Sequence, residues 1–510
     1  MKNLINSSLF IFVFSFLNAQ NTYDPLRYLV VFEEDTPLSE IEDIRQEHQA
    51  EEIWVSPFSE IRYWRSSGYP HYVGNDLIGD VKEEVKKLKG RPKVTGGGLN
   101  YRVITFVEPA GSGGVLPISC YANFEPESRA HSNSTIVSIL DTGLTPYGNY
   151  GPEFTFSYGS YTGHNYISDD NGVQDDQGHG THIAGIISNV SQHLDFNGLN
   201  QSDINFDVRK VFDANGTGSI SDIILGFDDA VLLGAKVINM SFAYNGERPE
   251  IKPDPLEYSI MKAAEEEVLV ICAAGNDETN NDLSSLPAFP ASYDCDNILS
   301  VGSVSCISLL SDFSNYGKNS VDITYLGEFI PGPSPVGMLV EKNGTSQSTA
   351  VVSGIATATA SYLDEPDYAK VKCAIMNTAT YNSNLQGLIL SSGVADALEA
   401  ATFQALGLCD EEHDNVSRSL TQSNKTNVDW NINPNLIVNG ASINIDASID
   451  GNFEIQILNL SGEVFMNKSI MCNKGTNSIF LDNISYLSKG TYIIKISNDK
   501  IIEHKMFVKL

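Results

Sequence analysis

The chain has 510 residues, and at roughly 150 residues per domain this length predicts two to four domains rather than one small module. Its 32 Lys and Arg against 64 Asp and Glu give a net charge of −32, which repels nucleic acid and anionic lipid headgroups. Seven cysteines are too few for a disulfide scaffold, and none has the spacing of a zinc ribbon. Composition therefore excludes nucleic-acid-binding and metal-clamped classes.

The first 19 residues have the three parts of a secretory signal peptide. Lys2 supplies a positive charge, residues 9–17 form an apolar run, and Ala19 precedes Gln20. A membrane anchor is the alternative, but the run is about half of the ~20 residues that span a bilayer. No later segment approaches that length, so we expect export of a soluble mature protein without a transmembrane segment.

Residues 21–118 predict a small α+β unit ahead of something larger. Its apolar strands are expected at residues 28–32 and 103–107, with helices at 38–49 and 81–89. A Gly-Ser-Gly-Gly segment follows at residues 111–114 and is typical of a linker.

Residues 130–405 alternate apolar runs with helical patterns. Strands are expected at 136–140, 208–211, 236–240 and 268–273, and helices after His179 and at 219–233 and 256–267. This alternation predicts an α/β fold, in which helices cover both faces of a mainly parallel sheet.

The last hundred residues have a different composition and hydrophobic pattern. Residues 410–432 are polar and typical of a linker. Residues 433–510 alternate apolar and polar side chains without a helical pattern, which predicts an all-β, antiparallel sandwich.

Three segments of the α/β region carry an acid, a base and a nucleophile. Asp141 ends an apolar strand, where open α/β sheets place their sites. His179 stands between two glycines at the start of a helix, and Ser346 follows Gly344 at the start of another. Asp141 and Ser346 each have an ordinary alternative as a turn or capping residue. His182 could suggest a metal pair with His179, but a third ligand is missing, so we interpret it as structural.

In the chain order Asp, His, Ser, these motifs resemble the subtilisin-like serine endopeptidases, the subtilases, over residues 130–405. The resemblance implies that Ser346 attacks the scissile carbonyl, that His179 transfers protons, and that Asp141 orients the imidazole. It also makes Asn276, in the segment 273–277, the oxyanion donor. No cofactor is required for such catalysis.

The resemblance further implies two backbone edges that hold an extended polypeptide substrate. The implied substrate-binding residues are Gly216, Thr217 and Gly218, then Ser241, Phe242 and Ala243, and finally Ala274 and Gly275. Ala243 departs from the family, which usually has Gly there. Subtilases often bind structural calcium, but the loop that begins at Asp213 lacks the ligands of an EF-hand, so the calcium ligands stay unknown.

Both flanking regions have resemblances of their own. Residues 21–118 are similar in outline to a subtilisin propeptide, which implies a zymogen whose partner is its own N-terminal unit; a permanent N-terminal domain is the alternative. Residues 433–510 resemble the C-terminal sorting domain of type IX secretion, which implies a secreted or cell-surface protein handled by that machinery. The motifs are Asn433-Pro434, Leu460-Ser461-Gly462 and Gly490-Thr491-Tyr492. A carbohydrate-binding or adhesive module is the alternative.

The cysteines leave the pairing open. Cys295 with Cys306 and Cys373 with Cys409 are candidate disulfides, Cys272 is expected as a core thiol, and the odd number leaves at least one thiol free or intermolecular.

The expected function is a secreted, monomeric serine endopeptidase made as a zymogen. A binding or adhesive protein on a degenerate protease fold is one alternative, and a cleft-blocked precursor is another. The presence of Asp141, His179, Ser346 and Asn276 together favours the enzyme over the degenerate fold.

Overall fold

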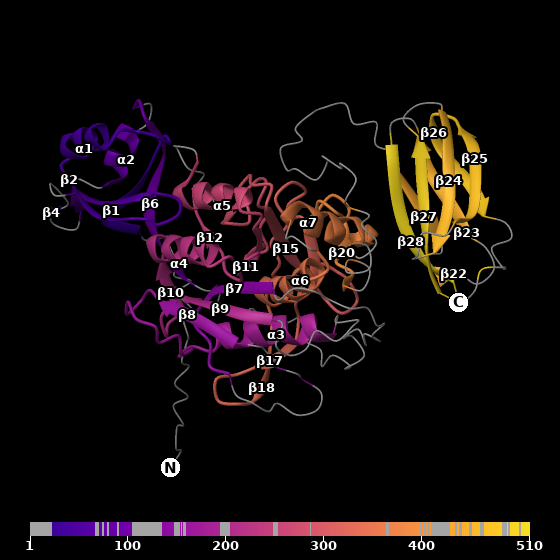
Figure 1. Ribbon diagram of the computed structural model, residues 1–510, viewed down its shortest axis with the longest axis horizontal. Helices are drawn as coiled ribbons and strands as arrows, with labels where there is room; N and C mark the ends of the chain where they lie inside the picture. The colour runs from indigo at the N-terminus through magenta and orange to yellow at the C-terminus, as the bar shows by residue number, and fades with distance from the viewer. Residues whose placement is uncertain are drawn as a thin grey trace, which may run out of the picture.

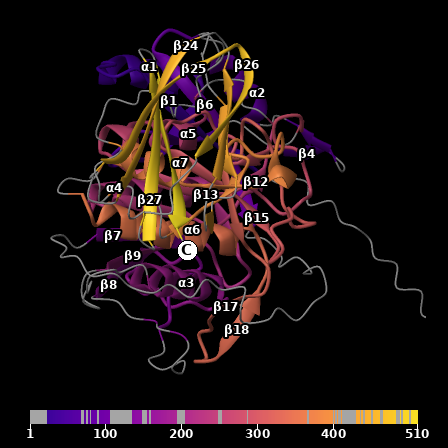
Figure 2. The same cartoon turned by 90° about the vertical axis from the view of Figure 1, so that its right-hand side faces the viewer.

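The computed structural model describes residues 23–104, 135–193, 204–400 and 429–509 apart from short gaps, together with Gln404 and Cys409. The predicted signal peptide and the glycine-rich linker lie outside these residues. Figure 1 shows three bodies in chain order, from the indigo N-terminal unit to the yellow C-terminal strands, and in Figure 2 the yellow strands lie in front of the rest.

The N-terminal unit is an antiparallel sheet with two helices on one face. Its elements are β1 (Tyr23–Phe32), α1 (Leu38–Glu47), β2 (Ala50–Val55), β3 (Arg62–Ser66), β4 (His71–Val73), β5 (Asp76–Ile78), α2 (Val81–Leu88) and β6 (Val94–Ile104). Both helices lie where the sequence predicts them, whereas the last strand begins nine residues before the predicted Val103. Three successive glycines at 96–98 conceal this part of the strand from an apolar pattern.

The strand β1 has two buried faces because its side chains alternate. Tyr28 and Val30 face α1 and α2 in the core of the unit. Leu29 and Val31 pack in a second core, which they share with helices of the next domain.

The central domain is built on a nine-stranded sheet of order β19-β20-β16-β15-β13-β11-β7-β9-β8. Its pairings are parallel except β19 with β20. The strands are β7 (Thr135–Asp141), β8 (Ser160–Asn165), β9 (Ile204–Lys210), β11 (Val237–Met240), β13 (Leu269–Ala273), β15 (Ile298–Val304), β16 (Ile323–Leu326), β19 (Thr380–Tyr381) and β20 (Gly393–Val394).

Helices cover both faces of this sheet, which confirms the predicted α/β fold. One face packs against α3 (His179–His193), α6 (Thr345–Ala360) and α7 (Tyr368–Asn377), and the other against α4 (Ile220–Leu232) and α5 (Pro255–Glu265). Short strands complete the domain: β10 (Thr217–Ser219), β12 (Tyr244–Asn245) with β14 (Ala288–Phe289), and the hairpin of β17 (Ile330–Pro333) and β18 (Leu339–Lys342).

The helix α6 lies fully inside the molecule. All sixteen of its residues are buried, and most are Ala, Ser, Thr or Val. Small side chains let α6 approach α3 closely: a Cβ at Gly354 would stand 2.7 Å from Val190 Cβ. The first turn of α6, which contains Ser346, therefore has a rigid support.

The C-terminal region is a sandwich of a three-stranded and a five-stranded sheet around its own core. Its strands are β21 (Asp429–Asn433), β22 (Leu436–Ile437), β23 (Ala441–Ala447), β24 (Gly451–Asn459), β25 (Val464–Cys472), β26 (Gly475–Leu481), β27 (Gly490–Asn498) and β28 (Ile501–Lys509). The sandwich is antiparallel as predicted except that β22 pairs parallel with β28. Because β21 begins at Asp429, the predicted linker 410–432 is too long at its end.

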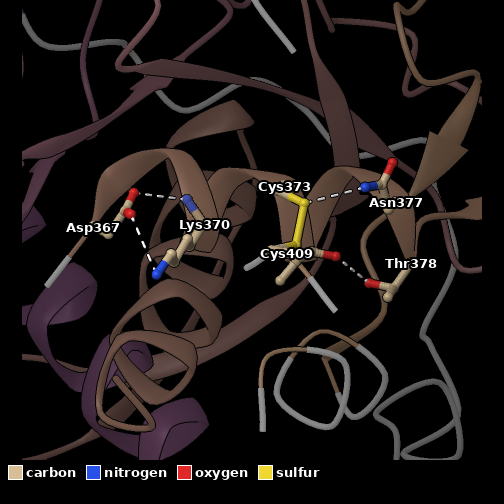
Figure 3. The surroundings of a disulfide bond; sticks show 7 residues. Asp367, Lys370, Cys373, Asn377, Thr378 and Cys409 are labelled. Atoms are coloured by element: carbon tan, nitrogen blue, oxygen red, sulfur yellow. Dashed lines mark hydrogen bonds and ion pairs between the residues drawn. A yellow bond between two sulfur atoms is a disulfide. The ribbon is translucent and has the colours of Figure 1, made fainter. Parts of the chain in front are cut away.

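The structure contains one of the two disulfides that the sequence suggested. Cys373 on α7 is bonded to Cys409 across 36 residues, as Figure 3 shows. The pair Cys295–Cys306 is wrong, because Cys295 is a buried thiol outside any disulfide whereas Cys306 is disulfide-bonded. Cys272 and Cys472 are also buried thiols outside any disulfide. Among the helices in the described residues, none has the length and apolarity that a membrane span requires.

Candidate active site

Asp141 and His179 form a buried pair at the carboxyl edge of the central sheet. Asp141 ends β7, and His179 begins α3. The His179 Nδ1 atom lies 2.8 and 2.9 Å from the two carboxylate oxygens of Asp141. With Nδ1 donating to Asp141, the imidazole keeps Nε2 as the nitrogen available to a reacting group.

Asp175 fixes the turn that delivers His179. One of its oxygens accepts from the Thr142 hydroxyl at 2.9 Å and from the Gly178 amide at 2.7 Å, and the other accepts from the Thr181 amide at 2.8 Å. The carboxylate thus caps α3 and ties it to the end of β7. Sequence reasoning missed this residue, although an Asp shortly before a helix is a capping signal.

Lys210 is a second missed residue of the site. Its buried ammonium group donates to the Thr142 carbonyl and, at 3.1 Å, to the Phe212 carbonyl, and it pairs with Asp176 at 2.7 Å. Lys210 therefore joins the ends of β7 and β9 directly behind Asp141. Only the pairing of β7 with β9 brings Lys210 close to Thr142, so no local sequence pattern could have revealed this contact.

Ser346 lies in the first turn of α6, and the residue is 2% exposed. Its Oγ donates to the Ser241 carbonyl at 2.7 Å, and Ser241 Oγ donates in return to the Ser346 carbonyl at 3.0 Å. Among the described side chains, no hydrogen bond joins Ser346 to His179. In free enzymes such catalytic bonds often form only with substrate.

Asn276 is held by the residue before the serine. Its Oδ1 accepts from both the amide and the hydroxyl of Thr345 at 2.9 Å, so Nδ2 must point away. That Nδ2 atom is buried and has no hydrogen-bond partner. The turn requires glycine before it: Gly275 has φ +113°, and a Cβ there would stand 2.3 Å from Asn315 Nδ2. Sequence reasoning missed Asn315, whose Oδ1 also accepts the Asp277 amide at 2.8 Å.

Two donors border the same space beside Gly344. A Cβ built on Gly344 would lie 3.2 Å from Asn276 Nδ2 and 3.7 Å from the Ser346 amide nitrogen. The Ser346 amide belongs to the first turn of α6, whose amides lack acceptors within the helix. An oxygen carrying negative charge would find two N–H groups and a helix N-terminus at this place.

The first predicted substrate edge is the strand β10 with the turn before it, whose residues 216–219 are buried or half-buried. Gly216 has φ +69°, and Asp213 accepts from the Asn215 and Thr217 amides at 2.8 and 2.9 Å, so its carboxylate serves this turn. The strand β10 pairs antiparallel with β6 of the N-terminal unit, with Thr217 opposite Ile104 and Gly218 opposite Val103.

The second predicted edge is more buried. Ser241 lies beside Ser346, whereas the ring of Phe242 packs against Phe212 at 4.9 Å in the core. Ala243 is 2% exposed, and Ala274 and Gly275 are buried behind Thr345. The structure therefore brings the backbone of this edge to the serine and directs the Phe242 side chain away from it.

His182 stands apart from the pair. Its Nε2 lies 3.1 Å from the Val340 carbonyl, and burial lowers the pKa of His182 to about 3. It is a neutral core residue under the β17–β18 hairpin, as predicted. Within the described part of the chain, no group of three His, Cys, Asp or Glu side chains could hold a metal ion.

Comparison with known proteins shows that the chain is similar to serine proteases. The family model "Subtilase family" matches residues 132–395, and "Secretion system C-terminal sorting domain" matches residues 433–509. The cell wall-associated protease of Bacillus subtilis is 34% identical over 45% of this chain, but only 24% of that protein is covered. The major intracellular serine protease of the same organism is 32% identical over 45% of this chain and 69% of its own length.

Solved structures agree at the level of the fold. The epidermin leader peptide processing serine protease of Staphylococcus aureus aligns with a TM-score of 0.54 at 17% identity. The alignment covers 74% of this chain and 98% of that one, so it reaches beyond the central domain.

Proposed function

Because the chain belongs to the subtilase family and carries a sorting domain for export, we propose that it is a secreted serine endopeptidase acting on polypeptides. The observation that carries the proposal is the convergence of three separate segments. The Asp141–His179 pair lies at the end of β7, Ser346 binds Ser241 just after β11, and Asn276, with its unpartnered Nδ2, follows β13, so all three lie at the carboxyl ends of neighbouring strands.

The proposed reaction uses only these side chains and a backbone amide. Ser346 leaves the Ser241 carbonyl, gives its proton to His179 Nε2 and attacks the scissile carbonyl carbon. Asp141 stabilises the resulting imidazolium, which then protonates the leaving amine. Water hydrolyses the acyl-enzyme by the same proton transfers in reverse. The carbonyl oxygen becomes an oxyanion bound by Asn276 Nδ2 and the Ser346 amide.

We propose in addition that the N-terminal unit is a propeptide and that the uncut chain is a zymogen. The support is that β6 pairs with β10, the margin where a substrate strand would add. The N-terminal unit also shares a hydrophobic core with α4 and α5, whereas a flexible linker would bury no apolar side chains against them.

The test is labelling of the purified, exported protein with a fluorophosphonate, followed by mass mapping of the label and of both termini. We expect the label on Ser346 and an N-terminus after the N-terminal unit. Ser346→Ala should abolish labelling and casein hydrolysis while the protein stays folded. A Ser346→Ala protein that still cleaves casein would refute the mechanism, and a labelled protein that retains residues 21–118 would refute the zymogen.

A further inference from the structure

We propose that the side-chain amide of Gln347 is a second side-chain donor to the oxyanion, beside Asn276. This inference rests on the proposed function, because it assigns a role in the same hydrolysis. It adds a residue that touches the reacting oxygen in the transition state.

The first observation is a buried amide oxygen without a hydrogen-bond partner. Gln347 directly follows Ser346 and is 1% exposed. Its Oε1 is buried and has no hydrogen-bond partner. A buried polar group without a partner destabilises the folded state, so such a group next to a nucleophile is expected to meet its partner in the substrate complex.

The second observation is the position of the side-chain oxygen of Gln347, which lies beside Gly344. A Cβ on Gly344 would stand 2.9 Å from Gln347 Oε1, against 3.2 Å from Asn276 Nδ2 and 3.7 Å from the Ser346 amide. All three atoms therefore border the space that an oxyanion would fill. Gly344, with φ +148°, keeps that space open because it has no side chain.

The charge of the reaction decides which atom of the amide faces the substrate. In the free protein the carbonyl oxygen, Oε1, borders this space. An oxyanion repels that oxygen, and a half-turn about the terminal torsion exchanges it for Nε2, which carries two N–H donors. That torsion is broad and two-fold, and Oε1 has no hydrogen bond that the rotation would break. Gln347 thus donates only when negative charge develops.

Gln347→Met is the principal variant, since it keeps the length of the side chain and removes the donor. We expect kcat to fall about 10- to 100-fold, somewhat less than for a preorganised donor, with KM changed less than about twofold. The affinity of a peptide boronic acid, which forms a tetrahedral adduct with the serine, should fall by a similar factor.

Gln347→Glu separates a donor from an acceptor at nearly constant shape. An ionised carboxylate cannot donate and repels the oxyanion, so kcat at neutral pH should fall further than in Gln347→Met. Gln404→Met is the matched control: Gln404 is also buried with an unpartnered Oε1, but it belongs to none of the elements that build the site. It should leave kcat unchanged.

The proposal is overturned if Gln347→Met keeps the kcat and boronic acid affinity of the wild type, or if Gln347→Glu is as active as the wild type. It is also overturned if Gln347→Met lowers the melting temperature and weakens KM and the boronic acid equally, because that pattern indicates a structural role. Failure of the proposed function looks different, since the wild-type protein itself would then neither label nor hydrolyse casein.

Discussion

At the scale of the residue, the site is held by groups that take no part in the proposed reaction. Thr345 orients Asn276, Asn315 shapes the turn after it, and Asp175 sets the turn before His179. Each donates to or accepts from a reacting residue or its backbone neighbours. His179 and Asn276 are therefore positioned before substrate arrives, which reduces the reorganisation that the transition state requires.

Asn276→Ala should separate turnover from binding. Removing Nδ2 takes away a donor that acts on the oxyanion but not on the uncharged substrate, so kcat should fall about 100- to 1,000-fold with little change in KM. This magnitude is the one known for the corresponding donor of subtilisin, a member of the same family. Steady-state kinetics on a peptide anilide would measure it.

Asn245→Ala offers a control, because the side chain of Asn245 binds Asp277 near the surface without reaching the serine. An Asn276→Ala protein that loses affinity for substrate but keeps kcat would contradict the assigned role.

The residues that sequence reasoning found and those that it missed differ in the range of their contacts. Asp141, His179 and Asn276 stand in short motifs that mark the end of a strand or the start of a helix. Lys210 and Asn315 act through partners that are distant in sequence, such as Thr142 and Gly275. No local pattern encodes such a contact, so only the folded sheet reveals it.

At the scale of the element, the contact between the N-terminal unit and α4 contains a buried carboxylate. Asp228 on α4 accepts from the hydroxyls of Ser56 and Ser59, from the Ser59 amide and from the hydroxyl of Ser259 on α5. Burial raises the pKa of Asp228 to about 6 despite these donors. The cluster joins the turn before β3 to both helices.

Asp228→Asn should flatten the pH dependence of the stability of the uncut protein. Since the folded pKa is raised above about 3.9, the folded state binds the proton more tightly, and the stabilisation is lost as pH rises from about 4 to 6. The group contributes up to about 3 kcal/mol over that window. Urea unfolding at pH 4.5 and 7 in the Ser346→Ala background would measure the difference.

The neighbouring Asp229→Asn is the control for this experiment, because Asp229 has a 37% exposed side chain and binds Tyr166 instead. Asp254, whose pKa is also raised to about 6 by burial, is intact in every variant, so it cancels in the comparison. Equal pH slopes for Asp228→Asn and the parent would rule out this role for Asp228.

Elements with a buried face were predictable and polar ones were not. The apolar strands β7, β11 and β13 lie within two residues of their expected positions. The strands β2 and β3 were missed because Glu51, Glu52, Arg62 and Arg65 form ion pairs across them and hide any apolar alternation. The parallel partner of β28 was missed for another reason: β22 has only two residues.

At the scale of the whole molecule, a covalent bond closes the last part of the central domain. The Cys373–Cys409 disulfide spans 36 residues, which corresponds to about 4 kcal/mol of loop-closure entropy in the unfolded chain. It joins α7 to residues beyond the final strand of the sheet, and Figure 3 shows the Asp367–Lys370 pair at the start of the same helix.

Cys373→Ala with Cys409→Ala should lower the free energy of unfolding by about 2–4 kcal/mol and leave kcat intact, because α7 carries no site residue. Urea unfolding and peptide hydrolysis measured on one preparation would test both parts. Cys295→Ala removes a buried thiol that is not part of a disulfide and serves as the control. A double variant as stable as the wild type would show that the bond does not stabilise the domain.

The burial of α6 has a consequence for how this molecule can change over generations. A helix without a solvent-facing side offers almost no neutral position, so nearly every substitution in residues 345–360 must be another small side chain. Substitutions are tolerated more readily in surface segments such as the β17–β18 hairpin, where Val336 and Met338 are 69% and 59% exposed. The helix that carries Ser346 is therefore expected to change little over generations, while such exposed segments remain free to diverge.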